Sequence, residues 1–280
     1  MEFFSRASAV LAYLSGAKSR VGLHRFNSEQ PYRGDLLTHR VQYNPYLHTA
    51  KAYLLLVKAL EADLQQRPML KLPSSELEVK APVFMPSDEE MEKVKKLVEE
   101  KYGGRIPSSL VLLNPNASDM LPLRKWDTPN FVTLGKKILD AYPNSGLVLT
   151  GAPSEQANCQ NILAAFNDPR VVAVAGETTL RELLVLYTLS SLLVTNDSGP
   201  GHFASMTTMP ALVLFGPETP ELFSPIGDRI EVIWKGLACS PCVNPFNHRF
   251  SPCNNNLCMQ HISADEVFEK VKDMLPSELS

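Results

Sequence analysis

The feature that most constrains the fold is a series of short apolar runs, each rich in valine and leucine. They are Ser109–Asn114, Gly146–Thr150, Val171–Ala175, Leu192–Thr195 and Ala211–Phe215. A strand that is apolar at every position is buried on both faces, which is typical of a parallel sheet covered by helices. Five such strands, separated by stretches with helical spacing, predict a doubly wound, Rossmann-like α/β domain.

Capping residues mark where helices begin around these strands. Thr128 before Pro129 predicts one helix start, and Thr179 predicts another. Outside the sheet, Ser87–Glu90 and Ser263–Glu266 have the pattern of capping boxes. The first predicts a charged helix before the sheet, and the second predicts a C-terminal helix after it.

The first eighty residues do not follow this pattern. They contain a helical stripe over Phe4–Leu14, one strand at Arg20–His24 and a helix over His48–Leu60. Because one strand cannot form a sheet alone, this segment either packs on the larger domain or is the end of a domain whose beginning lies outside the chain. We favour the second interpretation. It predicts a partial N-terminal domain and linker over residues 1–82 and the Rossmann-like domain over residues 83–280.

Charge and hydropathy exclude several classes of protein. Lysine and arginine number 27 against 30 aspartates and glutamates, a net charge of −3, so the chain has no excess of cations for a nucleic-acid backbone. The longest apolar runs are about six residues, whereas a transmembrane helix needs about 20. No signal peptide is recognisable at the N-terminus. These features predict a cytoplasmic protein.

The segment Thr195–Ser205 carries the densest group of ligand-binding residue types. A buried strand ends, a polar turn with glycine follows, and a helix begins, so backbone N–H groups and the helix dipole suit a diphosphate. Ser198 adds a hydroxyl donor and Gly199 permits close approach. Asp197 can fix the turn or bind a ligand hydroxyl, and His202 lies in the first helical turn. The alternative is an ordinary Asx-turn, but the position at the carboxyl end of a strand favours a ligand site.

Two other loops leave the same edge of the predicted sheet. The loop after the first strand carries Arg124 and Lys125, which could neutralise a diphosphate or could be solvated surface cations. Glu155, after the second strand, could accept hydrogen bonds from ribose hydroxyls or simply favour the start of its helix. The sequence has no Asp-x-Asp pair, P-loop, Gly-x-Gly-x-x-Gly or Gly-x-Ser-x-Gly. Metal-bridged sugar diphosphate, P-loop, NAD and hydrolase interpretations therefore lose their main support.

Five motifs in this order resemble glycosyltransferase family 9, the heptosyltransferase-like enzymes of GT-B fold. They are Asn114-Pro-x-Ala-Ser118, Arg124-Lys-Trp126, Leu149-Thr-Gly-x-x-x-Glu155, Thr195-Asn-Asp-Ser-Gly-Pro-x-His202 and Leu214-Phe-Gly-Pro217. The resemblance covers residues 109–275, and Arg20-Val-Gly22 and Leu37-Thr-His-Arg40 are similar to the end of the family's acceptor domain.

The resemblance implies an inverting, metal-independent and cofactor-free transfer of a sugar, heptose in particular, to the lipopolysaccharide core. The implied partners are an ADP-sugar donor and a lipid-linked saccharide acceptor, with peripheral contact at the inner face of the cytoplasmic membrane and no nucleic acid. In the matched motifs, Ser118 and Arg124 would contact the donor diphosphate, with Lys125 beside them. Glu155 would hold the ribose region and Thr178 would lie by the base.

By the same resemblance, the remaining donor contacts come from the strand-to-helix corner. Asp197, Ser198, Gly199 and His202 would complete the diphosphate and sugar pocket. Arg124 replaces the lysine that is frequent in the family, and Pro200-Gly201 replaces a bulkier apolar pair. The family's general base is an acidic residue early in the N-terminal domain, in a region without a counterpart here, so no catalytic residue is nominated.

Two other functions stay open at this point. The chain could be an inactive nucleotide-binding fragment or a module that pairs with another chain, or it could be a nucleotide-sugar epimerase of similar fold. Four of the five cysteines cluster in the sequence, at Cys239, Cys242, Cys253 and Cys258. Their spacing matches no strong metal template. A structural metal, disulfides and free thiols are all compatible with it, and we expect none of these residues in the active site.

Overall fold

The computed structural model describes residues 6–24, 36–117, 121–244 and 250–275. The chain divides into two compact units. The first comprises residues 1–80 with Glu221–Phe223 and Val243–Pro252. The second comprises Ala81–Pro220, Ser224–Cys242 and Cys253–Ser280.

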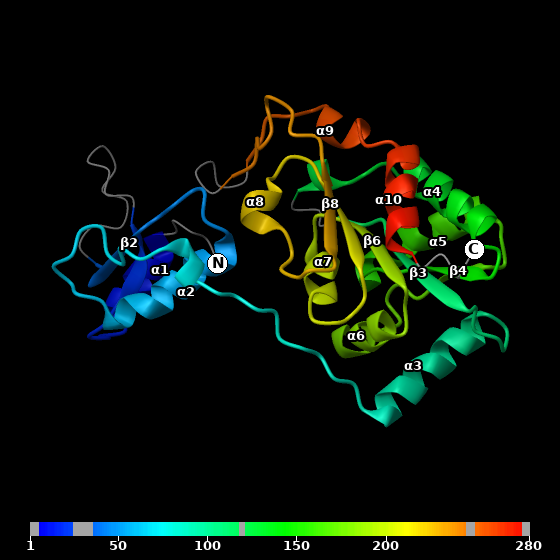
Figure 1. Ribbon diagram of the computed structural model, residues 1–280, viewed down its shortest axis with the longest axis horizontal. Coiled ribbons are helices and arrows are strands. Elements are labelled where there is room, and N and C mark those ends of the chain that lie inside the picture. The colour runs from blue at the N-terminus through cyan, green and yellow to red at the C-terminus, as the bar shows by residue number, and fades with distance from the viewer. Residues whose placement is uncertain (1–5, 25–35, 118–120, 245–249, 276–280) are drawn as a thin grey trace. The chain divides into compact units, whose positions relative to one another are not determined.

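Six parallel strands form the sheet of the second unit (Figure 1). They are β3 (Ser109–Asn114), β4 (Ser145–Leu149), β5 (Val171–Ala173), β6 (Leu192–Asn196), β7 (Ala211–Phe215) and β8 (Ile230–Trp234). Their order is β5-β4-β3-β6-β7-β8, so the winding direction reverses between β3 and β6, where open α/β sheets bind ligands. The predicted doubly wound sheet is confirmed, but the count of five strands is wrong. The sixth, β8, lies at the edge of the sheet and carries exposed Glu231, so it is not an apolar run.

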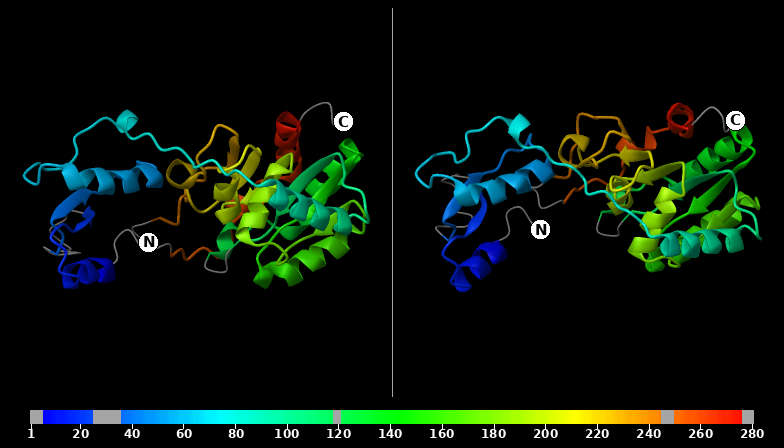
Figure 2. Two further views of the ribbon diagram at one scale, coloured as in Figure 1. Left: turned by 90° about the horizontal axis from the view of Figure 1, so that it is seen from below. Right: turned by 60° about the horizontal axis from the view of Figure 1, so that its bottom comes forward.

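Helices cover both faces of this sheet (Figures 1 and 2). Alternate residues of β3 point to opposite faces, so Leu113 packs in one core cluster and Leu112 in the other. One cluster contains α4 (Thr128–Ala141), α5 (Gln156–Phe166), α9 (Leu257–Gln260) and α10 (Ala264–Met274). The other contains α3 (Asp88–Lys101), α6 (Leu180–Thr188) and α7 (Gly199–Ala204). The short 3-10 helices η3 (Pro122–Arg124) and η4 (Pro153–Glu155) precede α4 and α5.

Most predicted helix starts are confirmed. Ser87 and Thr179 each accept a hydrogen bond from the backbone of the glutamate three residues on, and both capping boxes are complete. Ser263 is the N-cap of α10 and accepts from the backbone N–H of Glu266 at 3.1 Å, which is half of the predicted capping box. The cap of α4 is a correction, because Asp127 occupies the N-cap and Thr128 is already the first helical residue.

Ion pairs join α3 to α6 across their exposed sides. Arg181 of α6 pairs with Glu90 of α3, and Lys93 Nζ of α3 lies 2.7 Å from Glu182 Oε1 of α6. Hydrogen bonds from these cations hold the pKa of both glutamates at about 2, well below the usual value, so the pairs are fully charged at neutral pH. The apolar sides of the same two helices pack together with the sheet in one core cluster.

In its described residues, the first unit contains two short parallel strands, where the sequence predicts one. It consists of α1 (Arg6–Leu14), β1 (Val21–His24), β2 (His39–Gln42), α2 (Thr49–Lys58) and the 3-10 helices η1 (Ala59–Glu61) and η2 (Ser74–Glu76). β2 pairs in parallel with β1. The prediction of a single strand is therefore wrong, because only alternate residues of β2 are buried and the strand has polar residues at three of its four positions. No described helix has the length and apolar character needed to span a bilayer.

We expect Gly146→Ala to destabilise the protein. A Cβ atom at this position would lie 2.5 Å from Tyr102 Oη and 2.6 Å from Pro107 Cγ. The Tyr102 hydroxyl also donates to the carbonyl of Leu147 at 2.9 Å, so relief of the clash breaks a hydrogen bond. The free energy of unfolding should fall by about 1–3 kcal/mol. Urea unfolding of the full chain measures this. Gly227→Ala is the control, because Gly227 is exposed and a Cβ there would lie 3.5 Å from Ile230 Cγ1, an ordinary contact; it should change the free energy of unfolding by less than about 0.5 kcal/mol. Equal stability of the two variants would contradict the packing described here.

Candidate functional site

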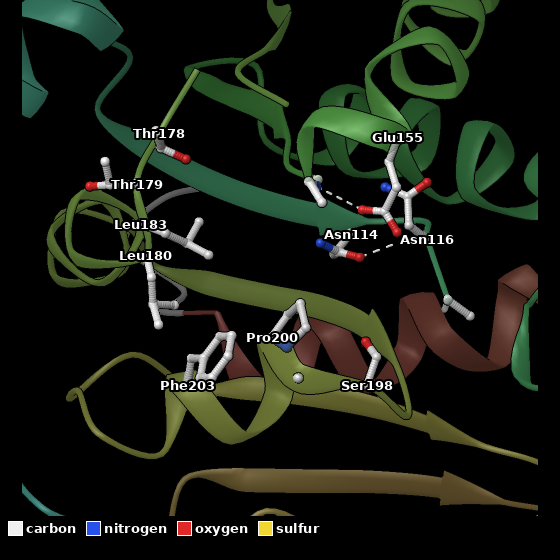
Figure 3. A pocket seen from close by; sticks show the side chains of 14 residues that line it. Asn114, Asn116, Glu155, Thr178, Thr179, Leu180, Leu183, Ser198, Pro200 and Phe203 are labelled. Carbon is white, nitrogen blue, oxygen red and sulfur yellow. Dashed lines mark hydrogen bonds between the residues drawn. The ribbon is translucent and has the colours of Figure 1, made fainter. Parts of the chain in front are cut away.

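A cavity of about 350 Å³ opens where β3, β4 and β6 end and where α6 and α7 begin (Figure 3). Its wall is amphipathic. Leu183 of α6 and Phe203 of α7 lie at one end, and Asn116 and Glu155 lie at the other. The volume is within the range of about 300–1,000 Å³ that small-molecule sites occupy. The cavity suits a ligand with one flat apolar end and one end rich in hydroxyls.

The polar end of the cavity is held by short hydrogen bonds. Glu155 Oε2 accepts from the backbone N–H of Ala152 at 2.7 Å, so the carboxylate stays at the rim of its own turn. Gly151 makes room for it, because a Cβ there would come within 3.1 Å of the same oxygen. Asn116 donates to the carbonyl of Thr150 at 3.2 Å. The loops after β3 and β4 therefore form one connected surface.

The corner between β6 and α7 borders the cavity with Ser198 and Gly199. Ser198 is the N-cap residue of α7, but its hydroxyl donates to the carbonyl of Asn196 at 3.1 Å and does not cap the helix. The N-terminus of α7, which forms part of the cavity wall, therefore has no side-chain cap. Helix N-termini favour anions because their first amides are not bonded within the helix.

Buried Asn196 fixes the loop between β3 and α4 against this corner. Its Oδ1 accepts from the backbone N–H of Trp126 at 2.9 Å, and its Nδ2 donates to the carbonyl of Asn116 at 3.1 Å. The indole of Trp126 is fully buried and donates to the carbonyl of Ile262 at 2.8 Å. Asn256 Nδ2 donates to the carbonyl of Leu123 at 3.0 Å. The loop that carries Arg124 is thus held from both sides.

Arg124 lies between two buried carboxylates. Its Nη1 is 3.7 Å from Asp197 Oδ2 and 3.6 Å from Glu218 Oε2. The side chains of these three residues are 14%, 4% and 3% exposed. Glu218 follows β7 in the loop Gly216–Thr219. We call Arg124, Asp197 and Glu218 the buried charge cluster.

The cluster changes the acidity of Asp197. Burial raises the pKa of its carboxyl to about 7, and the nearby charge of Glu218 adds to this, while Arg124 opposes it. A second carboxylate nearby in a dry environment disfavours the charged form of the Asp197 carboxyl. Asp197 therefore holds a proton up to about neutral pH.

The structure brings some of the predicted donor-site residues together. Glu155, Thr178, Ser198 and Gly199 all line the cavity. Ser118 lies outside the described residues. The donor roles of all these residues stay predictions.

Four other predicted residues lie near the cavity without lining it. Arg124 and Asp197 belong to the buried charge cluster, Lys125 is half-buried, and His202 is exposed on α7. Glu218 was not predicted, because it comes directly after the Leu-Phe-Gly-Pro motif and its partners are remote in sequence. Asn116 was also not nominated, although it lies within a recognised motif.

The four cysteines that cluster in the sequence are thiols with different exposure. Cys239 is exposed, Cys242 and Cys253 are half-buried and Cys258 is buried. Burial raises the pKa of Cys258, and the neighbouring Cys242 adds to the shift. Across the described ranges, no group of three or more histidine, cysteine or acidic side chains is arranged to hold a metal ion.

Comparison with known sequences identifies the relatives of the chain. The model of glycosyltransferase family 9 (heptosyltransferase) matches residues 5–248. Lipooligosaccharide heptosyltransferase 2 of Campylobacter jejuni serotype O:6 is 24% identical over 94% of this chain and 74% of its own length. The protein of the same name from serotype O:2 is 27% identical, but the match spans 58% of this chain and 50% of that relative. Lipopolysaccharide heptosyltransferase 2 of Escherichia coli K12 is 30% identical over 40% of this chain and 32% of its own length.

Solved structures show the same fold. The E. coli ADP-heptose lipopolysaccharide heptosyltransferase II superposes with a TM-score of 0.70 at 20% identity, covering 99% of this chain and 75% of that one. E. coli heptosyltransferase WaaC, solved with ADP, gives a TM-score of 0.59 at 14% identity over 97% of this chain and 70% of that one. These similarities confirm the predicted α/β fold of GT-B type.

The raised pKa of Asp197 predicts how stability depends on pH. The unfolded carboxyl loses its proton near pH 3.8 and the folded one near pH 7, so the folded state binds more protons between these values. The raised pKa of Asp197 stabilises the folded state fully below pH 3.8, and this stabilisation is lost as the pH rises through about 7. In Asp197→Asn this dependence is absent. The stability of the variant relative to the wild type should therefore rise from pH 4.5 to pH 7.5 by an amount on the order of 2 kcal/mol.

Urea unfolding at the two pH values measures the difference. Asp265→Asn is the matched control, because Asp265 is 78% exposed in its pair with Lys137 and should follow the wild type. A constant stability difference between Asp197→Asn and the wild type would contradict the raised pKa.

Proposed function

The chain belongs to glycosyltransferase family 9, and we propose that it transfers a heptose or a closely related sugar from an ADP-sugar to a saccharide acceptor of the lipopolysaccharide core. The observation that carries this proposal is the amphipathic cavity at the carboxyl edge of the sheet, at the point where the winding direction reverses. Its neighbours in structure include a heptosyltransferase solved with ADP.

An ADP-sugar matches the cavity by chemistry. The apolar end, with Leu183 and Phe203, suits the flat face of a base, and Thr178 lies at the same end (Figure 3). Glu155 at the polar end suits ribose hydroxyls, which a carboxylate oxygen accepts well. Ser198, at the start of α7, suits the diphosphate. The order base, ribose, diphosphate then leads from α6 towards the buried charge cluster.

The chemical step requires stabilisation of the departing nucleoside diphosphate. We propose that the transfer is inverting and needs neither metal nor cofactor, with the amides at the start of α7 and the cations Arg124 and Lys125 opposing the developing charge. Preorganised donors and cations in a site that excludes water are effective at this task. The fixed loop around Trp126 supports such preorganisation, because it limits the motion of both cations.

The acceptor is proposed to be lipid-linked and to meet the enzyme at the inner face of the cytoplasmic membrane by peripheral contact. A nucleic-acid partner is not expected at a net charge of −3. Purified full chain, ADP-heptose and an acceptor glycan lacking the transferred heptose test the proposal directly. A product with one added sugar and inverted anomeric configuration, formed in the presence of a chelator, is the expected result. Nucleotide binding without transfer would instead favour the inactive binding module, and conversion of the donor alone would favour an epimerase.

Glu155→Gln should weaken ADP binding about three- to tenfold, because the amide replaces a charged acceptor by a neutral one. The amide oxygen can still accept from the backbone of Ala152, so the turn is retained. Glu266→Gln is the matched control. Glu266 occupies the same position, three residues after the N-cap, in α10 and does not line the cavity, so its replacement should change ADP affinity by less than twofold. Calorimetric titration of both variants gives the comparison, and an equal effect would refute the role of Glu155.

A further inference from the structure

The polar end of the cavity contains an amide whose orientation is set by hydrogen bonds. Asn116 lines the cavity and is only 4% exposed. Its Nδ2 donates to the carbonyl of Thr150 at 3.2 Å and to Cys159 Sγ at 3.4 Å, so both amide hydrogens are used. Its Oδ1 accepts from Asn158 Nδ2 at 2.9 Å. These bonds allow one orientation of the amide, because in the reversed one its oxygen would face the carbonyl oxygen of Thr150.

The bond to the amide oxygen comes from Asn158, a residue of α5. Asn158 is half-buried and does not line the cavity. It belongs to none of the five motifs, and Asn116 occupies the position that the first motif leaves open. In the described part of the chain, Asn158 gives the one hydrogen bond that Asn116 Oδ1 accepts. Without it, the oxygen would be a buried acceptor with no partner, and the orientation of the amide would be less strongly fixed.

The amide of Asn116 lies against Glu155. A Cβ at Gly151 would be 2.7 Å from Asn116 Nδ2 and 3.1 Å from Glu155 Oε2, so both side chains approach the same point of the loop after β4. Figure 3 shows the two side chains together at the polar end. Burial raises the pKa of the Cys159 thiol, the hydrogen bond from Asn116 opposes this, and the charge of Glu155 adds to it. Rotation of the amide would therefore change the surface against which the carboxylate lies.

From this geometry we propose that Asn158 is a positioning residue of the donor site, which fixes the Asn116 amide and thereby the place of the Glu155 carboxylate, so that the site selects a nucleoside diphosphate with free ribose hydroxyls. The inference rests on the proposed function and on the ribose contact that it gives to Glu155. Asn158 itself touches no ligand and acts through Asn116.

ADP and 2′,3′-dideoxy-ADP are the suitable pair of probes, because they have the same base and charge and differ only in the two ribose hydroxyls. We expect the wild type to bind ADP about tenfold more tightly, since a hydrogen bond to a carboxylate is a strong one. In Asn158→Ala this ratio should fall below about threefold, because the carboxylate loses its fixed place. Calorimetric titration of the full chain with both nucleotides measures the ratio.

An isosteric variant tests the hydrogen bond itself. Asn158→Asp keeps the shape of the side chain, but an ionised carboxylate cannot donate, so the ratio should fall as in Asn158→Ala. The added charge repels both nucleotides equally and leaves the ratio unaffected. Asn161→Ala and Asn161→Asp are the matched controls, because Asn161 is exposed on the same helix, and both should keep the tenfold ratio.

A double-mutant cycle tests whether Asn158 acts through Asn116. Asn158→Ala should raise the dissociation constant of ADP about threefold in the wild type, but by less than about 1.5-fold in an Asn116→Ala background, where the amide is already gone. The same increase in both backgrounds would mean that Asn158 acts by another route, and it would overturn the proposal.

The outcomes separate the inference from the proposed function. If Asn158 only supports the fold, Asn158→Ala weakens both nucleotides by the same factor and keeps the tenfold ratio, which overturns the inference alone. Should Asn158→Ala not fold, the isosteric Asn158→Asp decides the same question. Equal wild-type affinity for the two nucleotides overturns the ribose contact of Glu155 and this inference, while ADP binding stands. Absence of ADP binding by the wild type refutes the proposed function, and the inference with it.

Discussion

The site depends on one buried side chain, the amide of Asn196 at the end of β6. It bonds to the backbone of two successive parts of the loop after β3, at Trp126 and at Asn116. These bonds connect the two central strands of the sheet at the edge where the cavity opens. Without them, two buried backbone groups would lose their partners, and the loop that carries Arg124 would be held only from the side of Ile262 and Asn256.

The carboxyl edge of the sheet has two parts of different character. The loops towards β4 form a cavity with polar and apolar ends, whereas the loops towards β7 form the buried charge cluster. The first part suits recognition of a ligand by shape and hydrogen bonds. The second part is nearly dry, so its charges interact strongly and the pKa of Asp197 is raised. A diphosphate at Ser198 would lie between these two parts.

The sequence predicts those parts that depend on local pattern. Central strands are apolar at every position, and helix starts carry capping residues, so both are recognisable without a structure. β8 and β2 are not predicted from the sequence, because they are edge strands in which polar residues such as Glu231 and Arg40 interrupt the apolar pattern. In the site, Glu155 and Ser198 are predicted because they lie in loops that directly follow strands. The ion pair of Arg124 with Glu218 is not predicted, because the two residues are 94 positions apart and meet only through the order of the strands.

The contact between α3 and α6 lies close to the cavity. Three residues of the cavity wall belong to the N-cap and the first turns of α6, namely Thr179, Leu180 and Leu183. The cations of the two cross-helix pairs, Lys93 and Arg181, are 72% and 61% exposed, so mobile ions reach them readily. Ionic strength thus acts on the cross-helix pairs, whose cations do not line the cavity. Concentrated salt therefore weakens these pairs without reaching the buried apolar side chains, Leu184 and Val185 among them, that keep α6 on the sheet.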